Sequence, residues 1–183
     1  MNLDVNGKKV LVRVDFNVPL DGNHQVTDDT RIRGALPTIN YLLDNGGSVI
    51  LMSHLGRPQK KRKEDGSIDR EQLTLQHVVG RLSKLLDREV KFCYEVVGDK
   101  ARRMAAELQP GEVLLLENTR FETGEKKGDR RLAEQLAQLG DLYVNDAFGS
   151  AHRAHVSTTT VADFFDAPHK SFGFLMEKEL KNA

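Results

Sequence analysis

Short apolar runs alternate along this chain with longer stretches in which apolar residues recur at helical spacing. The apolar runs cover residues 9–14, 48–52, 90–92, 113–116 and 142–144. Continuous short runs rich in Val, Leu and Ile are typical of strands that are buried on both faces of a parallel sheet. Between and after these runs, helical spacing predicts helices that end near residues 44, 86, 108, 139 and 180.

The regular alternation of strand and helix predicts an α/β fold. Parallel strands must be joined by crossover connections, which are usually helical and right-handed. Helices on both faces of one sheet give three layers. A chain of 183 residues suits one well-buried domain. We therefore expect a single Rossmann-like domain with a three-layer, doubly wound parallel sheet.

The first predicted helix has a clear start signal and an internal conflict. Asp28, Asp29 and Thr30 carry side chains that commonly cap helix N-termini. Pro37 lies inside the same stretch, and its ring removes one backbone donor from the helix. We therefore expect the regular helix to begin near Pro37 or to be kinked there.

Composition and charge narrow the class of protein. Lys plus Arg and Asp plus Glu number 27 each, and a zero net charge argues against a protein that coats nucleic acid. No run approaches the ~18 apolar residues of a membrane span, and no targeting signal is visible at the N-terminus. The single cysteine, Cys93, is expected to be a buried apolar residue in a reducing cytoplasm. The charged stretch 59–70 is expected to be a solvated loop.

Arginine and histidine recur where the predicted strands end. In open parallel sheets, ligands bind beyond the carboxyl ends of the strands, near a switch in strand order. A guanidinium group matches carboxylate and phosphate oxygens two at a time, so the recurrence predicts a pocket for a small, multiply charged anion. The residues concerned are Arg13, Asp15, Asn17 and Arg31 after the first strand, His54 and Arg57 after the second, Glu117, Asn118 and Arg120 after the fourth, and Asn145, Asp146, His152, Arg153 and His155 after the fifth.

Each of these residues also has a simpler explanation. Arg13 and Asp15 lie two residues apart, as a buried ion pair on one strand face would. A histidine such as His54 or His152, taken alone, is more often a hydrogen-bonded structural residue. A metal site would use His152 and the histidine three residues after it, but Asp146 is a weak third ligand. We therefore expect no metal.

Common nucleotide-binding and hydrolase motifs are missing. The sequence has no G-x-x-x-x-G-K-[ST] phosphate loop and no G-x-G-x-x-G after the first strand. It also lacks the G-x-S-x-G motif of many hydrolases. The sequence therefore predicts an anion pocket without an evident nucleotide site.

Six segments, taken in chain order, resemble signature motifs of the phosphoglycerate kinase family. A seventh, Gly173-Phe174-Leu175-Met176-Glu177-Lys178-Glu179-Leu180, resembles the start of the family's interdomain region. The six are Arg13-Val14-Asp15-Phe16-Asn17-Val18-Pro19, Asp28-Asp29-Thr30-Arg31-Ile32-Arg33, Ala35-Leu36-Pro37-Thr38-Ile39, Ser53-His54-Leu55-Gly56-Arg57-Pro58, Glu117-Asn118-Thr119-Arg120-Phe121 and Asn145-Asp146-Ala147-Phe148-Gly149-Ser150-Ala151-His152-Arg153-Ala154-His155.

The resemblance implies transfer of a phosphoryl group between 1,3-bisphosphoglycerate and Mg-ADP, which yields 3-phosphoglycerate and Mg-ATP in glycolysis. Arg31 would be the catalytic residue and would stabilise the phosphoryl group during transfer. Asp15 and Asn17 would orient the glycerate, whereas His54, Arg57, Arg120 and Arg153 would hold the phosphate that is not transferred. The implied substrate-binding set is Asp15, Phe16, Asn17, Arg31, His54, Leu55, Gly56, Arg57, Arg120 and Arg153, and a basic patch would be completed by Arg13, His152 and His155.

The two-domain plan of the family implies a division of this chain. Residues 1–172 correspond to the substrate-binding N-terminal domain and residues 173–183 to the start of the interdomain helix. The nucleotide-binding domain, which holds Mg-ADP or Mg-ATP, has no counterpart in this sequence. We expect a cytoplasmic monomer that binds 3-phosphoglycerate or 1,3-bisphosphoglycerate, without a cofactor, nucleic acid or membrane partner, and that is inactive alone. The alternative is a non-catalytic anion- or nucleic-acid-binding module on the same fold.

Overall fold

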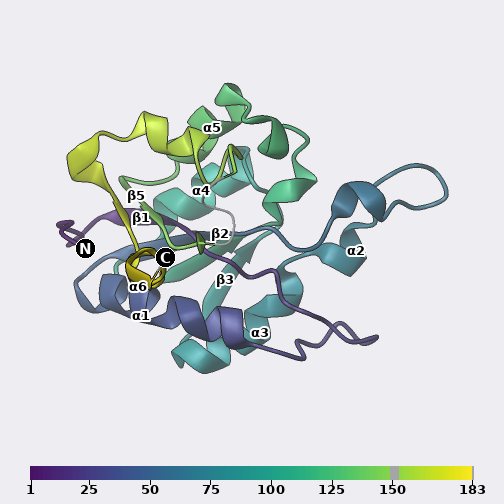
Figure 1. Ribbon diagram of the computed structural model, residues 1–183, viewed down its shortest axis with the longest axis horizontal. Helices are drawn as coiled ribbons and strands as arrows, with labels where there is room; N and C mark the ends of the chain where they lie inside the picture. The colour runs from purple at the N-terminus through teal and green to yellow at the C-terminus, as the bar shows by residue number, and fades with distance from the viewer. Residues whose placement is uncertain (149–152, 183) are drawn as a thin grey trace.

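The computed structural model describes residues 1–148 and 153–182, and a parallel sheet forms its centre (Figure 1). Every pairing between neighbouring described strands is parallel, in the order β3-β4-β2-β1-β5-β6. The predicted parallel α/β sheet is therefore confirmed. The strands are β1 (Lys9–Arg13), β2 (Ser48–Met52), β3 (Val90–Cys93), β4 (Val113–Leu116), β5 (Leu142–Asn145) and β6 (Lys170–Phe172).

Helices cover both faces of this sheet. In Figure 1, α1 and α3 lie on one side of the sheet and α4 and α5 on the other. The fold is thus the three-layer, doubly wound arrangement that the sequence predicts. The helices are α1 (Thr30–Asp44), α2 (Arg70–Leu73), α3 (Gln76–Leu86), α4 (Asp99–Glu107), α5 (Arg130–Ala137) and α6 (Phe174–Asn182). Short 3₁₀ helices occur at Pro58–Lys60, Thr119–Phe121, Glu125–Lys127, Thr160–Phe164 and Ala167–His169.

The strands supply two hydrophobic cores because successive side chains point to opposite faces of a sheet. On β1, Val10 belongs to the core that contains Leu82 of α3. The next residue, Leu11, belongs to the core that contains Leu136 of α5. Cys93 is buried in this second core, as expected. Burial on both faces explains why the strands read as continuous apolar runs.

The first helix does not begin near Pro37, which is one of the two outcomes expected for it. It begins at Thr30 and runs through the proline without interruption. Its start is stabilised by Asp28, whose Oδ1 accepts hydrogen bonds from Thr30 N at 2.9 Å and Thr30 Oγ1 at 2.6 Å. Ile32 and Ile39, on either side of the proline, are fully buried. Because tertiary packing supplies most helix stability, one missing donor is tolerated.

Two short elements are not predicted by the sequence pattern. β6 has three residues, Lys-Ser-Phe, and lies at the edge of the sheet, where it pairs with β5. α2 has four residues. Both are too short to show a periodicity, so their formation depends on neighbouring elements.

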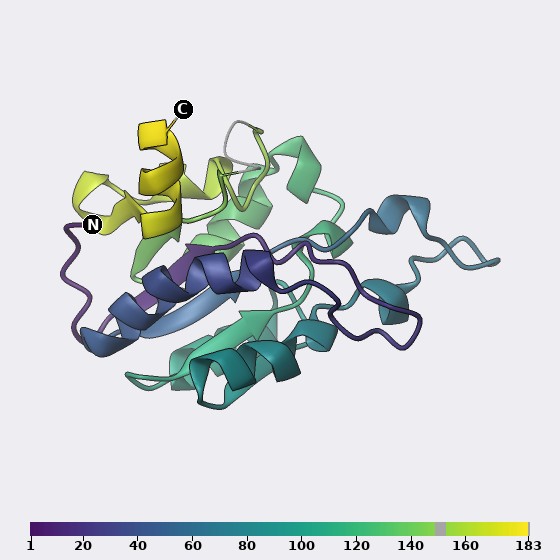
Figure 2. The same cartoon turned by 60° about the horizontal axis from the view of Figure 1, so that its bottom comes forward.

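Two surface features lie at opposite sides of the molecule. The charged stretch 59–70 projects away from the sheet (Figure 1), and residues 60–67 are exposed, in agreement with the predicted solvated loop. On the other side, the N-terminus lies beside α6 (Figure 2), and the amino group of Met1 is 3.1 Å from the Glu177 carboxylate. None of the helices in the described residues is long and apolar enough to cross a bilayer.

The strand order determines where a ligand site is expected. The chain passes from β1 to β2 on one side, whereas it continues from β5 to β6 on the other. β1 and β5 are neighbours, so the direction of winding reverses between them. Such a reversal opens a crevice at the carboxyl ends of the strands.

Candidate anion-binding site

A polar cavity of about 290 Å³ opens at the carboxyl edge of the sheet. Four arginines and one carboxylate line it, so a small anion suits the space. A larger hollow of about 690 Å³ adjoins it but has no comparable cluster of cations. The residues that line the cavity are Asp15, Asn17, Arg31, His54, Gly56, Arg57, Arg120 and Arg153, from the loops after β1, β2, β4 and β5 and the start of α1.

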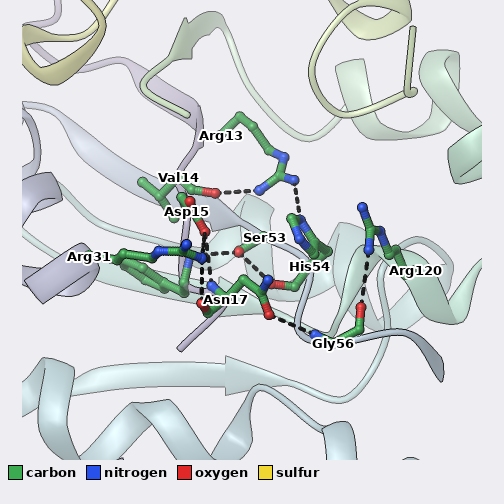
Figure 3. A network of polar contacts seen from close by, with 10 residues as sticks. Arg13, Val14, Asp15, Asn17, Arg31, Ser53, His54, Gly56 and Arg120 are labelled. Atoms are coloured by element: carbon green, nitrogen blue, oxygen red, sulfur yellow. Dashed lines mark hydrogen bonds and ion pairs between the residues drawn. The ribbon is translucent and has the colours of Figure 1, made fainter. Parts of the chain in front are cut away.

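The loop after β1 is held by its own polar groups (Figure 3). Arg31 Nη1 donates to Asn17 O at 2.7 Å and lies 3.5 Å from Asp15 Oδ1. Asn17 Oδ1 accepts from Gly56 N at 2.8 Å, which joins this loop to the loop after β2. The Arg31 side chain remains 53% exposed. Its guanidinium therefore braces the loop and still reaches the cavity.

Hydrogen bonds join the loops after β2 and β4, beside the loop after β1. Asn118 Oδ1 accepts from the N–H groups of Leu55 at 3.2 Å and Arg120 at 3.0 Å. Arg120 Nη1 donates to Gly56 O at 3.1 Å (Figure 3). Gly56 has a φ of +61°, and a Cβ there would lie 2.8 Å from Leu73 Cδ2. Only glycine suits this turn, and the turn sets the position of Arg120.

Arg13 lies behind the cavity and does not line it. Its side chain is 1% exposed. Nε donates to Ser157 Oγ at 2.9 Å, Nη2 donates to His54 Nδ1 at 2.8 Å, and Nη1 donates to Val14 O. The alternative of a buried ion pair between Arg13 and Asp15 is wrong. Arg13 is the last residue of β1, whereas Asp15 lies in the loop after β1, 3.5 Å from Arg31 at the start of α1.

His54 connects this buried arginine to the cavity. It is 6% exposed. Burial, followed by the charges of Arg13, Arg120, His155 and Arg153, lowers the pKa of His54 to about 2. The imidazole is therefore neutral near pH 7. It is hydrogen-bonded on one side, as a structural histidine would be, and it lines the cavity as well.

Two buried polar residues behind the site are not predicted by the sequence. Glu125 is 1% exposed, and its carboxylate accepts from Ser157 N and Ser157 Oγ, both at 2.7 Å. Tyr143 Oη donates to Ser157 O at 2.8 Å, and burial raises the pKa of this tyrosine. Glu125 stands in a charged run with two lysines and an aspartate, which favours a solvated loop. The local sequence therefore contains no signal of its burial.

Three further predicted site residues, Phe16, Leu55 and His155, do not line the cavity. Phe16 and Leu55 are buried in the core beneath α1 and α3, and Phe16 N donates to Ser53 Oγ at 2.9 Å. His155 is buried. His152 lies outside the residues that the structure describes. Their predicted contacts with a ligand therefore stay predictions.

Asp146, whose place in the sequence makes it at most a weak metal ligand, is hydrogen-bonded to α6. Its Oδ1 accepts from Leu175 N at 3.0 Å and Met176 N at 3.2 Å. Burial raises the pKa of Asp146 to about 6. Among residues 1–148 and 153–182 there is no group of three side chains that would hold a metal ion. Asp146 instead anchors the start of the last helix.

Arg120 shows most clearly that positive charges outnumber negative ones at the cavity. Its side chain is 6% exposed, and its buried Nε has no hydrogen-bond partner among the described residues. A buried donor without a partner costs roughly 1–3 kcal/mol. Burial and the charges of Arg13, Arg153 and Arg57 lower the pKa of Arg120, and Arg120 in turn lowers the pKa of Lys126. A bound anion would relieve this repulsion.

Comparison with known proteins places the whole chain in one family. A family model described as phosphoglycerate kinase matches residues 1–183. The phosphoglycerate kinase of Herpetosiphon aurantiacus is 57% identical over 175 residues, which cover 96% of this chain and 42% of the relative. That of Campylobacter concisus is 50% identical over 182 residues, which cover 100% of this chain and 44% of the relative.

Solved structures show the same relationship. The phosphoglycerate kinase of Coxiella burnetii superimposes with a TM-score of 0.81 at 35% identity, over 98% of this chain and 42% of that chain. That of Pyrococcus horikoshii OT3 superimposes with a TM-score of 0.83 at 33% identity, over 98% and 43%. The chain thus spans less than half the length of these relatives. Sequence, fold and the order of the motifs around the cavity agree, and this chain belongs to the phosphoglycerate kinase family.

Proposed function

We propose that this chain is the part of a phosphoglycerate kinase that binds 3-phosphoglycerate or 1,3-bisphosphoglycerate. The observation that carries the proposal is the cavity of about 290 Å³, with four arginines and one carboxylate around it. The ligand is small and mostly anionic, so its affinity must come from charge-assisted hydrogen bonds and not from apolar area. Membership in the family supports the same ligand.

The positions of the side chains suggest how such a ligand would lie. Arg120 is the most buried arginine of the lining, beside His54, and this inner end would hold the phosphate that is not transferred. Arg31 is the half-exposed arginine at the start of α1, and it would face the reacting carboxylate. Asp15 and Asn17, between these two ends, would orient the glycerate hydroxyl and backbone.

The chemistry of this reaction fits such a site. In the forward direction, the bond between phosphorus and the acyl oxygen breaks as an oxygen of ADP forms a new bond to phosphorus. The leaving group is a carboxylate, and in reverse the same carboxylate is already an ionised nucleophile. No general base is required, so positioning and charge stabilisation by groups such as Arg31 account for the catalysis.

Turnover also requires a nucleotide held in line with the acyl phosphate. In the family, the second half of the enzyme holds Mg-ADP or Mg-ATP. This sequence contains none of the common phosphate-loop motifs. We therefore expect the 183-residue chain to bind the glycerate substrate without catalysing transfer.

Backbone amide spectra of the chain during titration with 3-phosphoglycerate, and separately with Mg-ATP, test this function. The acid should shift the amides of Arg31, Arg57, Arg120 and Arg153, whereas the nucleotide should shift none of them. Arg57→Ala should weaken binding at least about tenfold, because a charge-assisted hydrogen bond is lost. The matched control is Arg62→Ala, an exposed arginine of the charged loop that does not line the cavity.

Two results would contradict the proposal. Appreciable kinase turnover by the purified chain would show that it is not an inactive half. Tighter binding of single-stranded DNA than of 3-phosphoglycerate at physiological salt would favour the alternative, a non-catalytic nucleic-acid-binding module.

A further inference from the structure

Four buried polar side chains form a continuous hydrogen-bonded chain behind the cavity. They are, in order, Glu125, Ser157, Arg13 and His54. Consecutive members are 2.7, 2.9 and 2.8 Å apart. The same pairs are separated by 32, 144 and 41 residues in the sequence, so only the fold brings them together. Of the four, His54 lines the cavity.

The direction of the first two hydrogen bonds follows from the number of protons available. An ionised carboxylate only accepts, and a serine hydroxyl has one proton. Ser157 Oγ therefore donates its proton to Glu125 at 2.7 Å and accepts from Arg13 Nε at 2.9 Å. Ser157 N also donates to the other carboxylate oxygen at 2.7 Å. With both oxygens engaged, the carboxylate has one orientation.

Arg13 in turn determines the direction of its hydrogen bond with His54. A guanidinium has five N–H donors and no acceptor. His54 Nδ1, 2.8 Å from Arg13 Nη2, must therefore accept. The neutral imidazole then carries its proton on Nε2. The hydrogen bond to Arg13 occupies Nδ1, so Nε2 is the ring nitrogen that remains for a ligand in the cavity.

Glu125 also supplies negative charge to this cluster. Burial lowers the pKa of Arg13. Among the charges that oppose this lowering, the charge of Glu125 has the largest effect. It opposes the effect of burial at Arg120 and His155 in the same way. Because Ser157 stands between Glu125 and Arg13, the charge is compensated without a direct ion pair. The Nη atoms of Arg13 are thus left to bond Val14 O and His54.

We propose that Glu125 and Ser157 are positioning residues of the anion site, and that they fix Arg13 so that His54 presents an Nε2–H donor to the bound phosphate. A neutral donor adds a hydrogen bond to the phosphate without adding another charge to the crowded arginines. The identity of the ligand rests on the proposed function. The tautomer of His54 does not, because it is a property of the chain without ligand.

Long-range ¹H–¹⁵N spectra of the ligand-free chain test the tautomer directly. At pH 7 we expect a protonated Nε2 and an unprotonated Nδ1 in His54. Ser157→Ala removes the acceptor for Arg13 Nε, and Glu125→Gln places an amide donor against Ser157 Oγ. Each substitution should move the two ¹⁵N signals of His54 toward a mixture of tautomers. Ser48→Ala, a buried serine at the amino end of β2, is the matched control and should leave them unchanged.

Titration of the same variants with 3-phosphoglycerate adds a functional measurement. The dissociation constant should rise about tenfold in Ser157→Ala and Glu125→Gln, because one hydrogen bond to a charged ligand is weakened. It should not change in Ser48→Ala. If Glu125→Gln does not fold, Ser157→Ala and the wild-type spectrum still decide the question, because that substitution removes one oxygen atom and no charge.

The possible outcomes separate this inference from the proposed function. A wild-type proton on Nδ1, or unchanged His54 signals in Ser157→Ala, would overturn the positioning role even if 3-phosphoglycerate binds. The expected tautomer and its loss in the variants, together with no binding of 3-phosphoglycerate, would instead leave the positioning role in place and refute the ligand.

Discussion

The arginines around the cavity fall into two groups that differ in burial. The inner pair, Arg13 and Arg120, is buried, and both side chains donate to protein oxygens or to His54. The rim arginines, Arg31, Arg57 and Arg153, are exposed. All five carry the same charge and lie at the same edge of the sheet.

One residue type therefore serves two purposes at this site. Moving a guanidinium out of water is costly unless it is paired and hydrogen-bonded. The inner pair therefore depends on fixed partners, and the fold around it depends on the inner pair in turn. The rim arginines are exposed to solvent, so they can reach a ligand and contribute less to folding than the inner pair. Substitutions in the two groups should therefore affect different properties.

The largest effect is expected from Arg13→Met. The substitution leaves Glu125 buried without its compensating charge, which should reduce the free energy of unfolding by about 3–5 kcal/mol. Urea denaturation measures this loss. In the double variant Arg13→Met/Glu125→Gln the loss should be smaller, because no buried charge is left unpaired. A loss below about 1 kcal/mol in Arg13→Met would remove the distinction between inner pair and rim.

A pH series tests whether His54 stays neutral beside the inner pair. Its pKa is about 2 in the folded chain, whereas an unfolded histidine has a pKa of about 6.5. Between these pH values the unfolded chain binds more protons than the folded chain. The contribution of His54 to the free energy of unfolding is therefore fully present above pH ~6.5. Below that pH the free energy of unfolding falls by up to about 1.4 kcal/mol per pH unit.

Comparison of the wild-type chain with His54→Gln isolates the contribution of His54 to this pH dependence. Glutamine keeps an acceptor for Arg13 and a donor for the cavity, and it does not titrate. The fall in unfolding free energy between pH 6.5 and ~4.5 should therefore be shallower in this variant. Equal slopes in the wild-type chain and in His54→Gln would contradict a buried neutral His54.

Gly56→Ala perturbs the turn that joins the two groups. Its positive φ costs an alanine about 1–2 kcal/mol, and the new Cβ would also press on Leu73 Cδ2 at 2.8 Å. Gly66→Ala is the matched control, since Gly66 has a φ of +86° with no heavy atom within 4 Å of an added Cβ. Thermal denaturation should show a larger loss for Gly56→Ala. Only this variant should also weaken binding of 3-phosphoglycerate, because Gly56 O holds Arg120.

The smallest effect on stability is expected from Arg57→Ala at the rim. The free energy of unfolding should change by less than about 0.5 kcal/mol, as for most exposed positions. Calorimetric titration should nevertheless show weaker binding of 3-phosphoglycerate. A variant that binds normally but unfolds more easily would reverse the expected roles of rim and inner pair.

The sequence predicts the fold well because its signals are local. Central strands that are buried on both faces are mostly apolar, and this makes β1, β2, β4 and β5 recognisable as apolar runs, whereas the edge strand β3 contains the partly exposed Lys91. β6 is not predicted because it has only three residues and its side chains are partly exposed. The start of α1 is misjudged because a proline is weighed without the packing of Ile32 and Ile39.

The composition of the cavity is also largely predictable. Strand ends in a parallel sheet converge on one edge, so arginines and histidines that follow strands are expected to meet. Gly56 is found only through the motif it belongs to, since a glycine has no chemistry of its own to suggest a site. Whether these residues bind 3-phosphoglycerate stays a prediction.

Only the tertiary structure decides which charged residues of the site are buried and which are exposed to a ligand. Arg13 and Arg57 look alike in the sequence, yet one is enclosed by Ser157 and His54 and the other is exposed. Glu125 resembles its solvated neighbours, yet it is buried against Ser157. Apolar periodicity is a property of neighbouring residues, whereas burial and the partner of a charge depend on segments up to 144 residues apart. The sequence alone determines the layers and the edge where the site lies, and the fold determines which charges are buried there.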